Sequence, residues 1–102
     1  MPIKNRLSEL HSEIVGWRRD IHRHPELRFE EQRTAALVAE QLRRFGCDEV
    51  VTEVGLTGVV GVIRGNQNTA GMTIGFRADM DALPLQEMTD LPHASILPGK
   101  MH

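Results

Sequence analysis

The sequence predicts an α/β fold in which two helices are followed by three strands and a loop. Apolar residues recur with helical period over residues 3–23 and again over residues 30–45, and three short apolar runs suited to strands follow between residues 49 and 78. Both helices would then cover one side of a three-stranded sheet. Such an arrangement fits a small complete domain, and it also fits the first part of a larger α/β domain.

The first predicted helix covers residues 3–23. Its apolar residues are spaced three or four apart, so they share one helical face. They are Ile3, Leu7, Leu10, Ile14, Trp17 and Ile21. Trp17 is expected in the core because it lies on this face. Pro25 ends the helix, because the residue before a proline avoids helical geometry.

The second predicted helix covers residues 30–45. Its apolar face consists of Ala35, Val38, Leu42 and Phe45. Gly46 is placed to end this helix, since glycine readily adopts the left-handed backbone conformation that closes one. The chain then changes to the shorter apolar repeats that are typical of strands.

The three predicted strands differ in pattern. Residues 49–54 alternate apolar and polar side chains, as a half-buried strand does, and residues 55–58 form a turn. Residues 59–65 are more uniformly apolar, so this strand is expected to be buried on both faces or nearly so. A polar loop, residues 66–71, leads to the third strand, residues 72–78, and a connection this short predicts an antiparallel hairpin.

Residues 79–102 are expected to be irregular. Pro84, Pro92 and Pro98 interrupt this part of the chain and leave no room for a helix between them. Nothing in residues 96–102 is expected to cap, close or pair with another segment. This tail favours the view that the chain is part of a larger domain.

Composition excludes several classes of protein. A chain of 102 residues with 40% hydrophobic content buries a modest core, which corresponds to one domain at most. A net charge of −2 gives no basic surface for nucleic acid or an anionic membrane, and no apolar run approaches the roughly 20 residues of a membrane span. The N-terminus lacks the apolar core of a signal peptide. The one cysteine, Cys47, cannot form an internal disulfide, so a cytoplasmic location is expected.

Two carboxylates, Asp79 and Asp81, directly follow the third predicted strand. Ligands of α/β folds bind in the crevice at the C-terminal ends of strands. A segment that places Arg77, Asp79 and Asp81 on one side could therefore direct carboxylates at a cation, or provide a catalytic base. The alternative is structural, because an aspartate after a strand commonly accepts hydrogen bonds from the N–H groups of its own loop.

The histidines and the cysteine each allow a structural interpretation and a chemical one. His22 and His24 stand at the end of the first helix with Glu26 after them, which is one way to supply metal ligands. Positions two apart do not share a helical face, so a helix cap or a hydrogen bond to a neighbouring loop is the preferred interpretation. Cys47 is expected to be a buried thiol, since a nucleophilic cysteine needs an adjacent base or an electropositive pocket.

Three segments, taken together, indicate more about function than the spacing of single residues does. They are RRDIHRHPELRFEEQRTA (residues 18–35), TGVVGVIRG (57–65) and FRADMDALPLQE (76–87). They resemble the N-terminal part of the peptidase M20 family. The resemblance is closer to its amidohydrolase branch, the hippurate hydrolase and N-acyl-amino-acid amidohydrolase type. The next segment of that branch is similar to LPHASILPGKMH (91–102). Because order and rough spacing agree, the resemblance spans nearly the whole chain.

The resemblance implies a hydrolase that cleaves the amide bond of N-acyl amino acids or related small amides, using two divalent metal ions (Zn, Mn, Co or Ni). Family members continue after GKMH with a Cys-Gly-His-Asp motif and later glutamates and histidines that supply the metal ligands and the general base. None of these residues is in this sequence. By resemblance, Asp81 supports the site beside the metals, Asp79 lines the same crevice, and no residue of this chain is a metal ligand. HRHPEL (22–27) is interpreted as structural.

Residues 1–102 are therefore expected to be the N-terminal portion of a metal-dependent amidohydrolase catalytic domain, without the smaller domain through which family members often dimerise. We expect this portion alone to be inactive and to bind no metal tightly. The full-length protein would be a homo-oligomer acting on a small molecule. The alternatives are a truncated non-catalytic chain, as a partner module or a degenerate gene product, and an unrelated small α/β binding domain.

Overall fold

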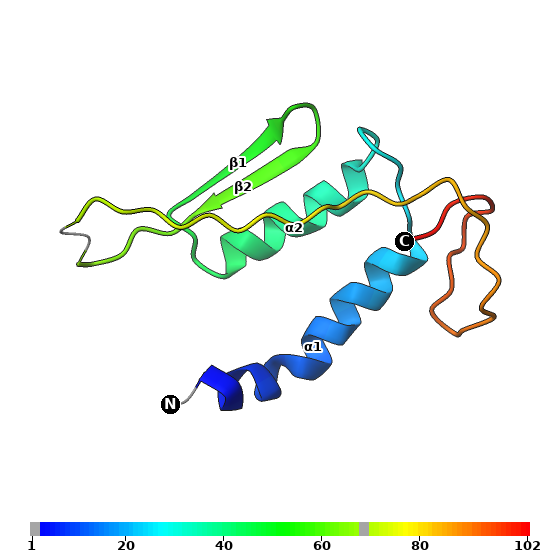
Figure 1. Ribbon diagram of the computed structural model, residues 1–102, viewed down its shortest axis with the longest axis horizontal. Coiled ribbons are helices and arrows are strands. Elements are labelled where there is room, and N and C mark those ends of the chain that lie inside the picture. Colours follow the sequence, from blue (N-terminus) through cyan, green and yellow to red (C-terminus); the bar gives the residue numbers. More distant parts are fainter. Residues whose placement is uncertain (1–2, 68–69) are drawn as a thin grey trace. The chain divides into compact units, whose positions relative to one another are not determined.

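The computed structural model describes residues 3–67 and 70–102. Within these residues the elements are α1 (Ile3–Arg23), α2 (Gln32–Arg44), β1 (Glu49–Val54) and β2 (Gly58–Val62), as Figure 1 shows. The chain forms two compact units. One contains α1, the residues up to Pro25 and the segment Ala82–His102, and the other is Glu26–Asp81.

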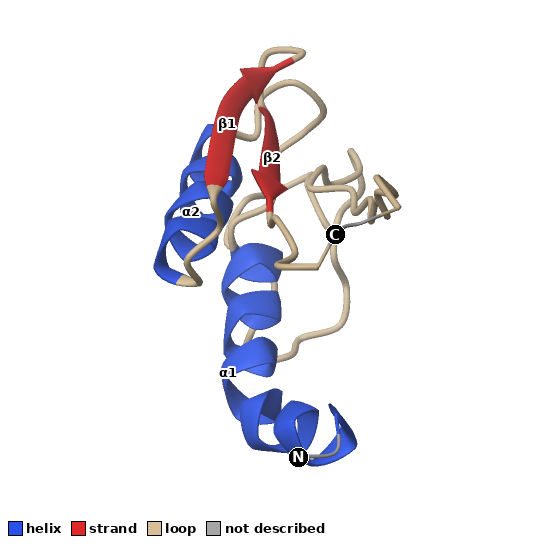
Figure 2. Cartoon of the chain, turned by 90° about the vertical axis from the view of Figure 1, so that its left-hand side faces the viewer, coloured by secondary structure: helices blue, strands red, loops and turns tan. Residues whose placement is uncertain are grey.

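In the unit Glu26–Asp81, a two-stranded antiparallel sheet packs against α2 (Figure 2). Glu49 pairs with Val62, and Val51 pairs with Val60. The small residue Ala39, in the middle of α2, is only 2% exposed. The close packing of α2 on the hairpin therefore forms the apolar core of this unit, and the helix-strand-strand part of the prediction is confirmed.

The N-terminus of α2 is held by a carboxylate from outside the helix. The helix begins at Gln32, two residues later than predicted, because the backbone of Glu31, with φ −81° and ψ 47°, lies outside the helical region. The Glu26 carboxylate accepts hydrogen bonds from the backbone N–H groups of Arg33 (2.9 Å) and Thr34 (2.6 Å), and from the Thr34 hydroxyl (2.6 Å). Glu26 thereby satisfies N–H groups that have no partner within the first turn.

The C-terminus of α2 forms as predicted. The helix ends at Arg44, and Gly46 follows with a φ of 83°. The Gly46 N–H donates to the carbonyl of Arg43 at 3.1 Å, and the Cys47 N–H donates to the carbonyl of Leu42 at 3.2 Å. A side chain at Gly46 would strain this conformation, which explains the glycine.

The prediction of a third strand over residues 72–78 is wrong. These residues are extended, but in the described part of the chain they pair with no strand. The observed hairpin joins β1 to β2 through residues 55–57, whereas the predicted hairpin joined β2 to residues 72–78. A strand requires a neighbouring ladder of hydrogen bonds, which an apolar pattern cannot supply. Ile74 and Phe76 are consequently 81% and 97% exposed.

The second strand is shorter and more exposed than predicted. β2 ends at Val62, no residue in it is buried, and Val60 is 45% exposed. One helix packed on a two-stranded sheet covers only one of its faces. The expected burial on both faces is therefore wrong. In the predicted loop 66–71, Asn68 and Thr69 lie outside the described residues.

α1 has its predicted bounds, and the buried Pro25 follows soon after its last residue. None of the helix is buried, and Ile3 and Leu7 are 77% and 54% exposed. Trp17 is half-buried, so its predicted place in a core is wrong: within its own unit only the irregular segment Ala82–His102 is available to cover the apolar face. Among the described residues, no helix combines the length and apolar character needed to cross a membrane.

The segment Ala82–His102 contains no helix or strand, as predicted, but it is not free of pairing. Leu83 and Met101 form an isolated antiparallel bridge with N–H···O distances of 2.8 and 3.0 Å. The Gln86 side-chain carbonyl also accepts a hydrogen bond from the Gly99 N–H at 2.7 Å. The expectation that residues 96–102 pair with nothing is therefore wrong, because the segment folds back on itself.

Candidate functional site

Asp79 and Asp81 line a hollow of about 400 Å³ in the unit Glu26–Asp81. Three parts of the chain form its walls: residues 28–31 before α2, residues 54–58 around the hairpin turn, and residues 77–81. The sequence predicted that the two aspartates would share a crevice, and both line this one. Their part in catalysis stays a prediction.

The floor of the hollow is held together by a buried hydrogen bond. The Thr57 hydroxyl donates to the Glu31 carboxylate, and these residues are 8% and 6% exposed. The bond joins the turn of the hairpin to the residue that precedes α2. The residue after the turn, Gly58, must be a glycine, because a Cβ at this position would lie 2.5 Å from the Val54 carbonyl oxygen. The backbone of the hairpin turn is therefore fixed in place against α2.

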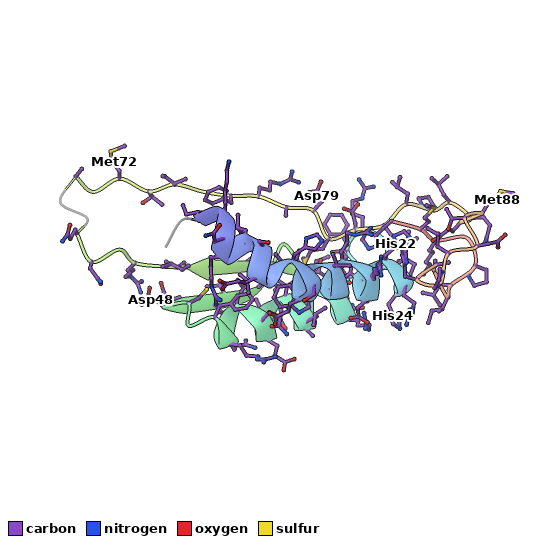
Figure 3. The ribbon with its side chains drawn as sticks, turned by 90° about the horizontal axis from the view of Figure 1, so that it is seen from below. His22, His24, Asp48, Met72, Asp79 and Met88 are labelled. Atoms are coloured by element: carbon purple, nitrogen blue, oxygen red, sulfur yellow. The ribbon has the colours of Figure 1, made fainter. Side chains whose placement is uncertain are left out.

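The rim of the hollow is charged and exposed. An Arg77 Nη2 lies 2.7 Å from an Asp79 Oδ1, and their side chains are 86% and 64% exposed. Asp79 projects from the extended segment that carries it (Figure 3). On another wall, the Arg28 guanidinium lies 5.7 Å from the centre of the Phe29 ring. The rim thus presents cations beside carboxylates, which suits a polar ligand.

Asp81 differs from Asp79 in its surroundings. It is half-buried, and within the described residues it has no hydrogen bond or ion pair. The expected alternative, an aspartate that accepts hydrogen bonds from its own loop, is therefore not what this structure shows for Asp81. Its carboxylate oxygens remain available to accept hydrogen bonds from a group brought into the hollow.

The pKa of Glu26 reflects its capping role at the start of α2. Burial raises this pKa, but the hydrogen bonds from Thr34 and Arg33, together with the Arg33 charge, outweigh that effect. The pKa of Glu26 therefore lies below its ordinary value. Glu26 belongs to the HRHPEL segment, so the structural interpretation of that segment has a physical basis in this cap.

In the other unit, a buried carboxylate joins α1 to the segment Ala82–His102. His22 Nε2 donates to Glu87 Oε1 at 2.8 Å, with side chains 13% and 3% exposed (His22 is labelled in Figure 3). Glu87 also accepts hydrogen bonds from the Thr89 hydroxyl and from the Ser95 N–H at 3.0 Å. The hydrogen bond from Thr89, followed by the bonds from Ser95 and His22, lowers the pKa of Glu87 to about 2.

The histidines make hydrogen bonds, which was the preferred interpretation of His22 and His24. His22 bonds the neighbouring loop through Glu87, and His24 Nδ1 lies 2.9 Å from the carbonyl oxygen of Asp20, in the last turn of α1. In residues 3–67 and 70–102, no three His, Cys, Asp or Glu side chains gather in a way that could hold a metal ion. Cys47 is half-buried, less than the buried thiol expected.

Sequence reasoning missed three carboxylates that organise the structure, Glu26, Glu31 and Glu87. Glu26 could have been suspected, because an acid shortly before a helix is suited to its N-terminus. No comparable signal marks Glu87, whose histidine partner lies 65 residues away in sequence. Glu31 was predicted to lie inside the second helix, whereas it directly precedes that helix.

Comparison with known proteins gives the chain its relatives. No protein-family model matches it. It is 50% identical over 94 residues to the hippurate hydrolase of Campylobacter jejuni, covering 92% of this chain and 24% of that protein. It is 42% identical over 100 residues to the N-acyl-L-amino acid amidohydrolase of Geobacillus stearothermophilus, covering 98% of this chain and 26% of that protein.

A solved structure identifies the family. A dinuclear metal-binding peptidase of the M20 family from Bacillus subtilis matches the fold with a TM-score of 0.83 and 41% identity, over 93% of this chain and 26% of that one. The chain is related to the M20 peptidases. This confirms both the family suggested by the motifs and the α/β fold of an M20-type hydrolase. The M20-related chain spans about a quarter of the length of the curated relatives it matches.

Proposed function

We propose that the chain is the N-terminal portion of the catalytic domain of a metal-dependent amidohydrolase. Its substrates would be N-acyl amino acids or related small amides. The relatives support this substrate class, since two of them are named hippurate hydrolase and N-acyl-L-amino acid amidohydrolase. A cytoplasmic location is part of the proposal, because a single cysteine is typical of a reducing compartment.

The observation that carries the proposal is the hollow that Asp79 and Asp81 share. The proposal gives Asp81 a supporting part: its half-buried carboxylate would accept a hydrogen bond from a metal-binding side chain and hold that side chain in orientation. Asp79, on the exposed rim and paired with Arg77, would line the crevice. Metal binding is assigned to none of the described residues, because they do not gather into a ligand set.

A chimaera tests the proposal. This chain would replace the matching quarter of the Geobacillus stearothermophilus amidohydrolase, to which it is 42% identical. We expect the chimaera to release amino acid from an N-acyl-L-amino acid in the presence of divalent metal. Asp81→Asn should lower kcat by about 10–100-fold, the usual cost of removing a partner of a metal ligand, with little change in KM.

Glu49→Gln is the matched control, because this carboxylate is exposed and lies on β1, away from the walls of the hollow. It should leave kcat unchanged. A folded chimaera without activity would contradict the proposed function. An active chimaera in which Asp81→Asn behaves like the control would contradict the role of Asp81 alone.

The chain by itself is proposed to be inactive. We expect no metal-dependent release of amino acid by the purified 102-residue chain, and no tight divalent metal binding in calorimetry. Metal-dependent release by the isolated chain would overturn this part of the proposal and would favour a complete enzyme.

A further inference from the structure

Three side chains form a cluster where α1 meets the segment Ala82–His102, and we call His22, Glu87 and His93 the clasp. His22 donates to Glu87 at 2.8 Å, and the His93 ring lies edge-on to the His22 ring with 5.7 Å between centroids. Glu87 is 3% exposed. The clasp therefore contains two imidazoles and one carboxylate with little access to solvent.

Backbone contacts hold the same part of the segment on α1. The Ile96 N–H donates to the carbonyl of Arg23, the last residue of α1, at 2.9 Å. An Arg23 Nη2 donates to the carbonyl of Pro92 at 3.3 Å, and the Ala94 N–H donates to Leu91 at 2.9 Å to close a turn. His93 sits inside this turn, so a force on its ring acts on contacts that hold residues 91–96 to the helix.

The charges around His93 are predominantly positive. Arg18, Arg19 and His22 come from α1, and Glu87 comes from the segment itself. Arg23 contacts the turn, and the His102 ring lies 6.4 Å from the His22 ring. Glu87 is already engaged by His22, Thr89 and Ser95. A proton added to His93 would therefore face the charges of Arg18, Arg19 and His22, and would share one carboxylate that already has partners.

We propose that the clasp is an acid-sensitive fastening, in which protonation of His93 releases residues 91–96 from the end of α1. Glu87 stays ionised and keeps its bond to His22 while this happens. The device is separate from the proposed function, because it lies in the unit that does not contain the hollow.

The direction of the effect follows from the electrostatics. Burial lowers the pKa of His93, and the charges of Arg19, Arg18 and His22 lower it further, while Glu87 acts in the opposite sense. A histidine whose folded-state pKa is depressed is neutral in the docked state. It binds a proton more readily when released. Docking is therefore fully stable above the ordinary histidine pKa of about 6.5, and it weakens as the pH falls through that value.

Amide hydrogen exchange of the 102-residue chain, followed by NMR, tests the proposal. The Ile96 amide reports docking directly, because its hydrogen bond goes to Arg23. We expect its protection factor to fall several-fold between about pH 7.5 and about pH 5, a window that spans the histidine pKa. His93→Gln should abolish this fall, since glutamine retains a polar side chain and takes up no proton.

Two further variants keep the test decisive. Arg19→Gln alters an exposed side chain and removes one of the cations that oppose the proton in the docked state, so the fall in the protection factor should become smaller. His11→Gln changes an exposed histidine of α1 outside the clasp, so it should leave the fall unchanged. An equal fall in His93→Gln, or a constant protection factor in the unaltered chain, would overturn the proposal. If His93→Gln fails to fold, Arg19→Gln decides the question: a smaller fall supports the role of His93, and a fall of unchanged size counts against it.

Discussion

The floor and the rim of the hollow each carry a carboxylate, but the two carboxylates lie in opposite surroundings. On the floor, the Glu31 carboxylate is 6% exposed and receives the hydroxyl of Thr57. On the rim, the Asp79 side chain is 64% exposed and pairs with the exposed side chain of Arg77. A buried carboxylate with a fixed donor contributes to the fold, because losing the donor would strand a desolvated charge. An exposed carboxylate contributes little to the fold and remains available to a ligand.

The largest effect should come from the backbone of the floor. Gly58→Ala would place a Cβ 2.5 Å from the Val54 carbonyl oxygen, and a backbone atom cannot move aside as a side-chain end can. We expect a loss of about 1–3 kcal/mol in the free energy of unfolding, the usual cost of overpacking. Urea denaturation followed by circular dichroism measures it.

Gly16→Ala is the matched control for that substitution. Gly16 lies within α1, and a Cβ there would have no atom within 4 Å. This change should raise stability by about 0.5–1 kcal/mol, because alanine loses less backbone entropy in a helix. Equal effects of the two substitutions would show that the hairpin turn is not tightly fixed.

The cap beside the floor should have an intermediate effect. Glu26→Gln removes the charge and leaves one acceptor oxygen where the carboxylate has two, so it can serve only one of the N–H groups of Arg33 and Thr34. We expect a loss of about 0.5–2 kcal/mol at neutral pH, within the range known for helix caps. Thermal unfolding at several pH values measures the loss.

The pH dependence of this variant sharpens the assignment. The pKa of Glu26 is lowered in the folded chain, so its contribution is present above the ordinary value of 4.5 and is lost as the pH falls through the folded-state value. Acid should therefore destabilise the unaltered chain more than Glu26→Gln. If the stability of the two chains depended on pH in the same way, the result would contradict the role of Glu26 as a helix cap. Glu87, with a pKa of about 2, supplies a similar loss in both, and so does not disturb the comparison.

The smallest effect should come from the rim. Asp79→Asn breaks an exposed ion pair with Arg77, and such pairs are worth about 0–1 kcal/mol. Thermal unfolding should therefore show almost no change, and the small difference should vanish at high salt. A loss as large as that of Gly58→Ala would show that Asp79 belongs to the fold, and the distinction between floor and rim would fail.

The sequence predicted the parts of this fold that depend on neighbours in the chain. α1 and the C-terminal end of α2 at Gly46 follow from spacing and backbone preference over a few residues. The start of α2 depends on Glu26 and on the non-helical backbone of Glu31, and no helical pattern contains that information. Local rules therefore placed the helices and misjudged one of their ends.

Patterns of apolar residues within a short stretch could not predict pairing between segments that are distant in the sequence. Residues 72–78 have the composition of a strand, but composition does not provide the neighbour that a strand requires. The same limit explains why the bond between His22 and Glu87 was missed. In contrast, the common hollow of Asp79 and Asp81 was predictable, because residues two apart on an extended segment point the same way.

The bridge between Leu83 and Met101 has a consequence for how such chains can diverge. Its two backbone hydrogen bonds bring the ends of the intervening residues together. Doubling the length of a flexible closed loop costs only about 0.6 kcal/mol of entropy. Insertions and deletions can therefore accumulate between the two bridged positions, outside Glu87 and residues 91–96 that hold the segment to α1, while the entry and exit of the loop stay in register. Related sequences should differ in length there more freely than between Thr57 and Asp81.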